Sequence, residues 1–114
     1  MNIKKNNCSF NIKGSYSEEW FSNNKLDTWE PDTFHILEHY KTNKNSVYID
    51  IGAWIGPTVL YSANIYNKVI AIEPDKIAIE RLEQNMSCNN FNNITLIQKA
   101  LSNINGRSKF GGGN

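Results

Sequence analysis

The sequence lacks most of the features that would assign it directly to a functional class. Its 12 lysine and arginine residues nearly balance its 11 aspartate and glutamate residues, which leaves a formal net charge of +1. A chain so close to neutral has no strong field to attract nucleic acid or a charged membrane surface. It also has no apolar run approaching the roughly 20 residues of a membrane-spanning helix. We therefore expect neither a nucleic-acid partner nor a membrane partner.

Cysteine is scarce, and so is any signal for export. Cys8 and Cys88 are far apart and form no Cys-x-x-Cys pair, so the sequence predicts neither a disulfide framework nor a cysteine zinc site. The positively charged residues 1–5 are not followed by the apolar stretch of a secretory signal peptide. We expect a cytoplasmic protein with two reduced thiols.

The rest of the composition is that of a folded chain. Hydrophobic residues make up 39% of it and aromatic residues 11%, which is too apolar for a disordered protein. At 114 residues, one compact unit is expected. Within it we distinguish an N-terminal segment with a short helix, residues 1–45, from the more regular residues 46–114.

Hydrophobic periodicity and helix-start signals predict three helices, all of them after residue 30. Residues 1–25 show no clean period, so short strands or loops are expected there. A helix is predicted to begin at Pro31, because apolar residues recur behind it at helical spacing: Phe34, Ile36, Leu37 and Tyr40. Another is predicted to begin at Pro57. A third, capped by Asp75, presents one apolar face: Ala78, Ile79, Leu82 and Met86.

Compact apolar runs predict strands at residues 47–51, 68–73 and 94–97, the first of them buried on both faces. Asn105-Gly106 is a hairpin-turn signal before residues 107–110. Strands that alternate with helices imply an α/β fold, a Rossmann-like parallel sheet with flanking helices. This corresponds to half of a doubly wound nucleotide-binding fold.

The first strand of such a sheet is central and pairs on its other side with a strand that follows later in the chain. No later strand and helix units are recognisable here, so we expect the apolar edge of residues 47–51 to be open. An open apolar edge favours association with other chains. The chain is therefore interpreted as a fragment, or as one that needs another chain, with an oligomer through the open edge as one expectation.

Candidate ligand-binding residues follow the first two strands. Gly52 and Gly56, in the turn after the first strand, would let the backbone approach a ligand closely, and N–H groups at the helix start would face it. Glu73 ends the second strand, where a carboxylate can accept both hydroxyls of a ribose. Asp50 could hold a cationic amino group. The Gly-x-x-x-Gly spacing excludes a P-loop and disfavours a dinucleotide site, and such glycines also occur in crossover units without a ligand.

Three blocks of sequence, residues 48–58, 71–75 and 98–102, resemble in this order the FkbM family of S-adenosylmethionine-dependent methyltransferases. The resemblance extends over roughly residues 29–110. It implies a Rossmann-like class I methyltransferase fold, with residues 46–114 as a partial domain that binds S-adenosylmethionine. In the complete protein it implies methyl transfer to an oxygen of a sugar or other small metabolite, the acceptor being the expected partner.

The resemblance also implies a role for each candidate residue. The methionine part of the cofactor would lie against the loop residues: Asp50, Gly52, Ala53, Trp54 and Gly56. Glu73 would bind the ribose, and the adenine would lie near Asp75 and Ala100. Many relatives carry asparagine at position 54, so a packing role is the alternative for Trp54. No catalytic residue is assigned, because the part of the family fold that holds the acceptor is not recognisable here.

Two alternatives to a working methyltransferase stay open. One is an inactive remnant or a binding piece that depends on a partner. The other is a zinc peptidase, because His35-x-x-Glu38-His39 matches the inverted H-x-x-E-H motif, in which two histidines bind zinc and the glutamate activates water. The simpler interpretation places both histidines on the rim of an amphipathic helix, and we expect no metal site.

Overall fold

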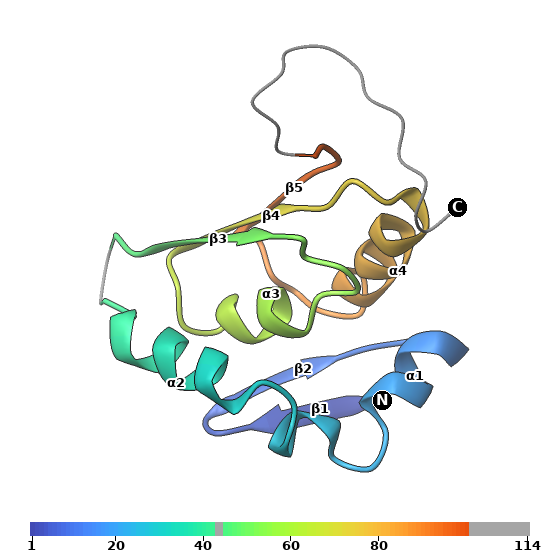
Figure 1. Ribbon diagram of the computed structural model, residues 1–114, viewed down its shortest axis with the longest axis horizontal. Coiled ribbons are helices and arrows are strands. Elements are labelled where there is room, and N and C mark those ends of the chain that lie inside the picture. The colour runs from blue at the N-terminus through green and yellow to red at the C-terminus, as the bar shows by residue number, and fades with distance from the viewer. Residues whose placement is uncertain (43–44, 101–114) are drawn as a thin grey trace.

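The computed structural model describes residues 1–42 and 45–100 (Figure 1). In chain order the described elements are β1 (Asn2–Lys5), β2 (Cys8–Asn11), α1 (Ser15–Phe21), the 3-10 helix η1 (Lys25–Asp27), α2 (Pro31–Tyr40), β3 (Val47–Ile51), α3 (Pro57–Ser62), β4 (Lys68–Ile72), α4 (Lys76–Met86) and β5 (Ile94–Ile97). The alternation of helices and strands predicted from Pro31 onward is confirmed. The turn predicted at Asn105-Gly106 lies outside the described residues.

The larger sheet is parallel and has the strand order β3-β4-β5. Its register sets Ile49 opposite Ile70, and Ile70 opposite Thr95. α3 contacts β3 and β4 on one side and β2 on the other, so it lies between the sheet and the N-terminal hairpin (Figure 1). The predicted α/β class, a parallel sheet with flanking helices, is confirmed. Among the described residues β3 pairs with β4 alone, so the edge expected to be open is open there.

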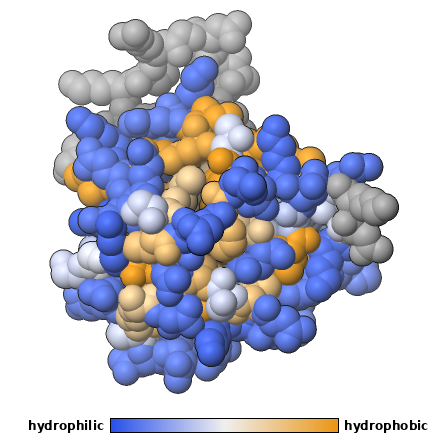
Figure 2. Space-filling view, turned by 180° about the vertical axis from the view of Figure 1, so that it is seen from behind, coloured by the Kyte–Doolittle hydropathy of each residue, from blue (hydrophilic) through white to orange (hydrophobic). Residues whose placement is uncertain are grey.

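The two faces of this sheet have different surroundings. Successive side chains of a strand point to opposite faces, and Asp50 of β3 is buried on the helix side. On the opposite face Val47, Ile49 and Ile51 are 49%, 53% and 62% exposed. The prediction that β3 is buried on both faces is therefore wrong, because the described helices cover only one of them. Figure 2 shows apolar residues reaching the surface near the top of the molecule, where the sheet lies.

The N-terminal segment is more regular than its sequence suggests. β1 and β2 form an antiparallel hairpin, and Asn6 in its turn adopts a left-handed conformation with φ 53°. The following helix α1 was not predicted. Ile3 and Phe10 of the hairpin are buried in one hydrophobic cluster with Val59 and Leu60 of α3. The hairpin and the sheet thus share a core.

Helix α2 begins at Pro31 as predicted, but its apolar stripe is narrower than expected. Phe34 and Leu37 are buried, whereas Ile36 and Tyr40 are 57% and 67% exposed. Only one side of the helix is packed against the other described residues. None of the helices in the described ranges is long and apolar enough to cross a membrane.

Candidate site at the carboxyl edge of the parallel sheet

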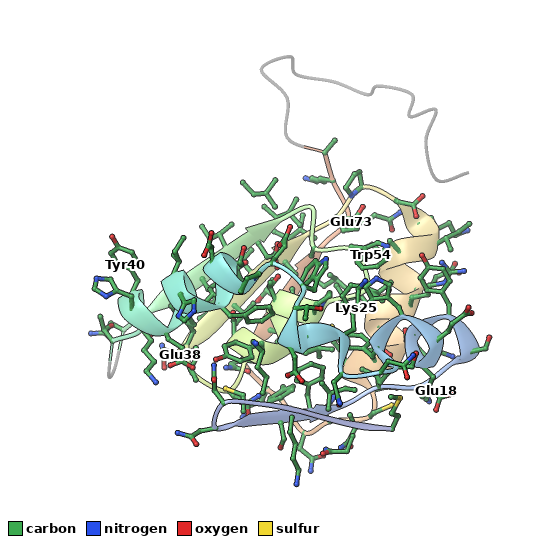
Figure 3. The ribbon with its side chains drawn as sticks, turned by 60° about the horizontal axis from the view of Figure 1, so that its bottom comes forward. Glu18, Lys25, Glu38, Tyr40, Trp54 and Glu73 are labelled. Carbon is green, nitrogen blue, oxygen red and sulfur yellow. The ribbon has the colours of Figure 1, made fainter. Side chains whose placement is uncertain are left out.

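The loop after β3 and the end of β4 meet at one edge of the sheet. The backbone N–H of Trp54 donates to Oε1 of Glu73 at 2.7 Å, and the N–H of Gly52 donates to the carbonyl of Ile72 at 2.8 Å. Figure 3 shows Trp54 and Glu73 close together. The carboxyl ends of neighbouring parallel strands lie on the same edge, which is where α/β sheets bind ligands. The structure therefore brings together the two parts of the predicted site.

Glu73 is nearly buried, with 7% of its surface exposed. Its second oxygen, Oε2, accepts a hydrogen bond from the N–H of Asp75 at 3.0 Å. A carboxylate offers about four acceptor positions, and the two N–H groups of Trp54 and Asp75 use two of them. The carboxylate is thus fixed in place by the backbone and keeps acceptor capacity for two further hydroxyl groups.

The two loop glycines have different surroundings. Both have positive φ, +78° at Gly52 and +100° at Gly56. A Cβ at Gly52 would meet nothing within 4 Å, whereas a Cβ at Gly56 would lie 2.4 Å from Cδ1 of Leu82 in α4. Gly52 therefore leaves room for a ligand, and Gly56 lets α3 pack against α4. The N–H groups of Gly52 and Ala53 both donate to the carbonyl of Ile72 and are not free for a ligand.

Asp50 lies on the helix side of β3 and is 8% exposed. The hydroxyl of Thr58, in the first turn of α3, donates to Oδ2 of Asp50. Burial raises the pKa of Asp50, against the lowering effect of hydrogen bonds from Thr58 and Tyr48. Burial and the nearby Asp50 raise the pKa of Tyr48 in turn. Asp50 thus ties β3 to α3, and its predicted contact with a cationic amino group stays a prediction.

Trp54 packs against aromatic side chains of α1. Its backbone is left-handed, with φ 55°, a conformation that asparagine adopts more readily than other non-glycine residues. Its ring makes edge-to-face contacts with Trp20 and Tyr16, at centroid distances of 4.9 and 6.2 Å. These contacts support the alternative in which Trp54 is a packing residue. Ala53 is buried beside it.

Asp75 and Ala100, the residues predicted near the adenine, differ in their surroundings. Asp75 caps α4 as predicted, because its Oδ2 accepts from the N–H of Ala78 at 2.8 Å. Its backbone N–H also binds Glu73, so it belongs to the same edge. Ala100 is exposed, in irregular backbone beyond β5. The adenine contacts of both residues stay predictions.

Asn85 is a residue of this region that the sequence interpretation missed. It is fully buried in α4, where its Nδ2 donates to the carbonyl of Ile55 and to Oγ of Ser17, both at 3.0 Å. Its Oδ1 accepts from the N–H of Lys13 at 3.0 Å. Asn85 therefore joins the glycine loop to α1 and to the segment that precedes it. The available signal was an amide at position i+3 from Leu82, on the apolar face of α4.

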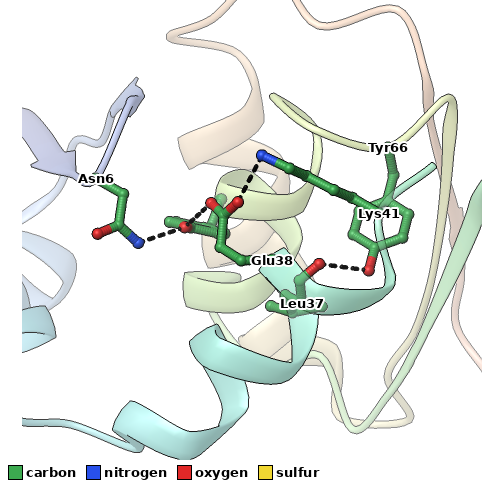
Figure 4. A network of polar contacts seen from close by, with 6 residues as sticks. Asn6, Leu37, Glu38, Lys41 and Tyr66 are labelled. Atoms are coloured by element: carbon green, nitrogen blue, oxygen red, sulfur yellow. Dashed lines mark hydrogen bonds and ion pairs between the residues drawn. The ribbon is translucent and has the colours of Figure 1, made fainter. Parts of the chain in front are cut away.

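The zinc-peptidase motif lies on α2, but its glutamate has other partners. Oε2 of Glu38 pairs with Nζ of Lys41 at 2.6 Å, and its Oε1 accepts from the hydroxyl of Tyr61 (Figure 4). The hydrogen bond from Lys41 lowers the pKa of Glu38. His35 and His39 are exposed. Within residues 1–42 and 45–100, no group of three or more potential ligands could hold a metal ion, so the structure does not support this alternative.

Comparison with known proteins gives structural matches only. No protein-family model matches the chain, and no curated protein matches its sequence. SMU.1697c, a candidate methyltransferase of Streptococcus mutans in complex with SAH, is similar with a TM-score of 0.54 and 22% identity, over 60% of this chain and 39% of that one. Trm5b of Pyrococcus abyssi is similar with a TM-score of 0.55 and 19% identity, over 84% of this chain and 27% of that one.

TYW2 of M. jannaschii, solved in complex with AdoMet, gives a TM-score of 0.46 at 24% identity, over 85% of this chain and 42% of that one. The first two matches show the fold alone: the parallel sheet and its helices match part of the Rossmann-like α/β fold of those two chains. It spans less than half the length of each of these chains.

Proposed function

We propose that the chain is the cofactor-binding part of an S-adenosylmethionine-dependent methyltransferase of the FkbM type. In the complete protein the acceptor is an oxygen atom of a sugar or other small metabolite. One observation carries the proposal: the N–H of Trp54 holds the Glu73 carboxylate at the edge where the loop leaves the sheet. The fold shared with SMU.1697c, whose structure contains SAH, supports it.

The described residues fit the groups that such a cofactor presents. Glu73 keeps acceptor capacity for the two ribose hydroxyls, and Gly52 has open space where a side chain would stand. Asp75 and Ala100 are proposed to lie against the adenine. When bound, S-adenosylmethionine supplies a methyl group on a cationic sulfur. The task of this chain is then to hold the donor in a fixed orientation, because displacement at that carbon depends mainly on proximity and alignment.

Calorimetric titration with S-adenosylmethionine and with its demethylated product tests the proposal. The wild-type chain is expected to bind both. Glu73→Gln should weaken both by at least about tenfold, because hydrogen bonds to a charged group contribute roughly 1.5–3 kcal/mol. Glu80→Gln makes the same change of charge at an exposed site on α4 and serves as the control.

Thermal melts of all three proteins check that each is folded at the titration temperature. No heat from the folded wild type, or equal affinities for wild type and Glu73→Gln, would refute the cofactor site. Equal losses in Glu73→Gln and Glu80→Gln would refute the role given to Glu73.

A binding piece that depends on a partner is the second candidate, and the uncovered face of the sheet favours it. Parallel sheets are normally covered on both faces, yet Ile49 and Ile51 are more than half exposed. On this interpretation the cofactor site forms fully only when that face is covered. Cofactor binding that appears only in an associated form of the chain would support this candidate over a self-sufficient site.

A further inference from the structure

A hollow separate from the carboxyl edge of the sheet lies between α1 and η1. Its volume of about 560 Å³ is within the range of about 300–1,000 Å³ that is typical of small-molecule sites. Tyr16 and Trp20 supply its aromatic surface, and polar side chains surround them. Trp20 packs against the hydrophobic core as well as lining this hollow, and Tyr16 is 42% exposed.

The indole of Trp20 is held rigidly by its neighbours. Its ring makes edge-to-face contacts with Trp29, Trp54 and Phe21, at centroid distances of 5.0, 4.9 and 4.8 Å. Trp20 is nevertheless only half-buried, and it lines the hollow. A fixed aromatic surface binds a ligand without losing side-chain entropy on binding, so Trp20 is suited to be the floor of a site.

The polar side chains around this floor are balanced in charge and varied in hydrogen bonding. Glu19 offers only acceptors, and Lys25, whose Nζ lies 5.8 Å from the centroid of the Trp20 ring, offers only donors. The neutral groups of the rim both donate and accept: Ser22, Asn23 and Thr28. Among the lining residues one carboxylate is balanced by one ammonium, and the guanidinium of Arg81 lies over the Tyr16 ring, 3.7 Å from its centroid. The lining itself therefore has no cluster of like charges that would select a phosphate or a polycation.

We propose that this hollow binds a neutral polyhydroxylated ring, that is, a saccharide unit. One face of such a ring presents C–H groups with partial positive charge, which pack favourably on the negative face of the Trp20 indole. Its hydroxyl groups point outward in the ring plane and both donate and accept. They match a rim that combines the carboxylate of Glu19, the ammonium of Lys25 and neutral amide and hydroxyl groups.

This site stands on the hollow alone and does not need the cofactor. Trp20 touches Trp54 of the glycine loop, so a saccharide on Trp20 is one side chain away from that loop. Figure 3 shows Lys25 and Trp54 on the same side of the molecule. The arrangement suits a binding site for the acceptor, but titrations without cofactor keep the two proposals distinguishable.

The test is an NMR titration of the full chain, without cofactor, with the methyl glycosides of glucose, galactose, mannose and N-acetylglucosamine. At least one should give a saturable shift of the Trp20 indole N–H. Glu19→Gln should weaken its binding by about tenfold, because a charged acceptor is lost. Glu18→Gln changes the neighbouring residue, which is exposed and outside the lining, and should leave affinity within about twofold.

A titration in which none of the glycosides gives a saturable shift would overturn the proposal. So would equal losses of affinity in Glu19→Gln and Glu18→Gln, because the effect would then come from net charge alone. If a glycoside binds while S-adenosylmethionine does not, the saccharide site stands and the proposed methyltransferase function fails.

Discussion

The paired substitutions Gly52→Ala and Gly56→Ala test the candidate site most directly. Both change a glycine of positive φ in the same loop, so both place an alanine in a conformation that costs about 1–2 kcal/mol. They differ in what the added methyl group meets. At Gly52 it meets open space, whereas at Gly56 it would lie 2.4 Å from Leu82 Cδ1.

The two variants should therefore differ in stability. Gly52→Ala should lower the free energy of unfolding by about 1–2 kcal/mol through its backbone alone. Gly56→Ala adds an overpacking cost of about 1–3 kcal/mol, for a total of roughly 2–5 kcal/mol. Because small domains unfold with only about 5–15 kcal/mol, the second variant should lose a large share of its stability.

The order of effects should reverse for cofactor affinity. A methyl group on Gly52 stands where the ligand is proposed to approach, so Gly52→Ala should weaken S-adenosylmethionine by at least about tenfold. The folded fraction of Gly56→Ala should lose less affinity. Urea denaturation and calorimetry measure the two quantities. Wild-type affinity in Gly52→Ala would refute the open approach, and equal stability of the two variants would refute the packing role of Gly56.

Two further predictions concern the core and the sheet. Asn85→Leu should lower the free energy of unfolding by about 2–4 kcal/mol, because the buried carbonyl of Ile55 and the N–H of Lys13 lose their partner. A loss below about 0.5 kcal/mol in urea denaturation would contradict this role. Ile49→Lys and Ile51→Lys should shift the chain from oligomer toward monomer in sedimentation, because a charge there opposes burial of the exposed apolar face. A monomeric wild type would show that the exposed face does not drive association.

The elements after residue 30 could be predicted because their apolar residues follow the spacing of strands and of helices with one buried face. Short apolar runs indicated the three parallel strands. For α4, the sequence indicated both the cap at Asp75 and the apolar face. Helix α1 could not be predicted in this way. It has seven residues, and only Ser17 and Phe21 are buried, so no apolar stripe is visible in its sequence. Its position depends on contacts with Asn85 and Trp54, which are distant in the chain.

The candidate site likewise combines contacts that could be predicted from the sequence with contacts that could not. The meeting of Glu73 with the glycine loop could be predicted, because it follows from parallel strands that end at one edge. The different surroundings of Gly52 and Gly56 could not. They depend on Leu82, which reaches Gly56 from another helix, and a glycine in a sequence does not indicate whether a ligand or a packed side chain occupies the space beside it.

The prediction that β3 is buried on both faces was wrong, and the exposure of one face has a physical consequence. Its apolar run is typical of a strand covered on both faces, yet among the described residues the helices cover only the face that carries Asp50. An exposed row of Val47, Ile49 and Ile51 is unfavourable in water and lies beside an edge that has no partner strand within residues 1–42 and 45–100. The composition of β3 thus matches a two-sided environment that the described elements provide on one side only. This mismatch is why we expect association through the sheet, and why the lysine substitutions at Ile49 and Ile51 test it.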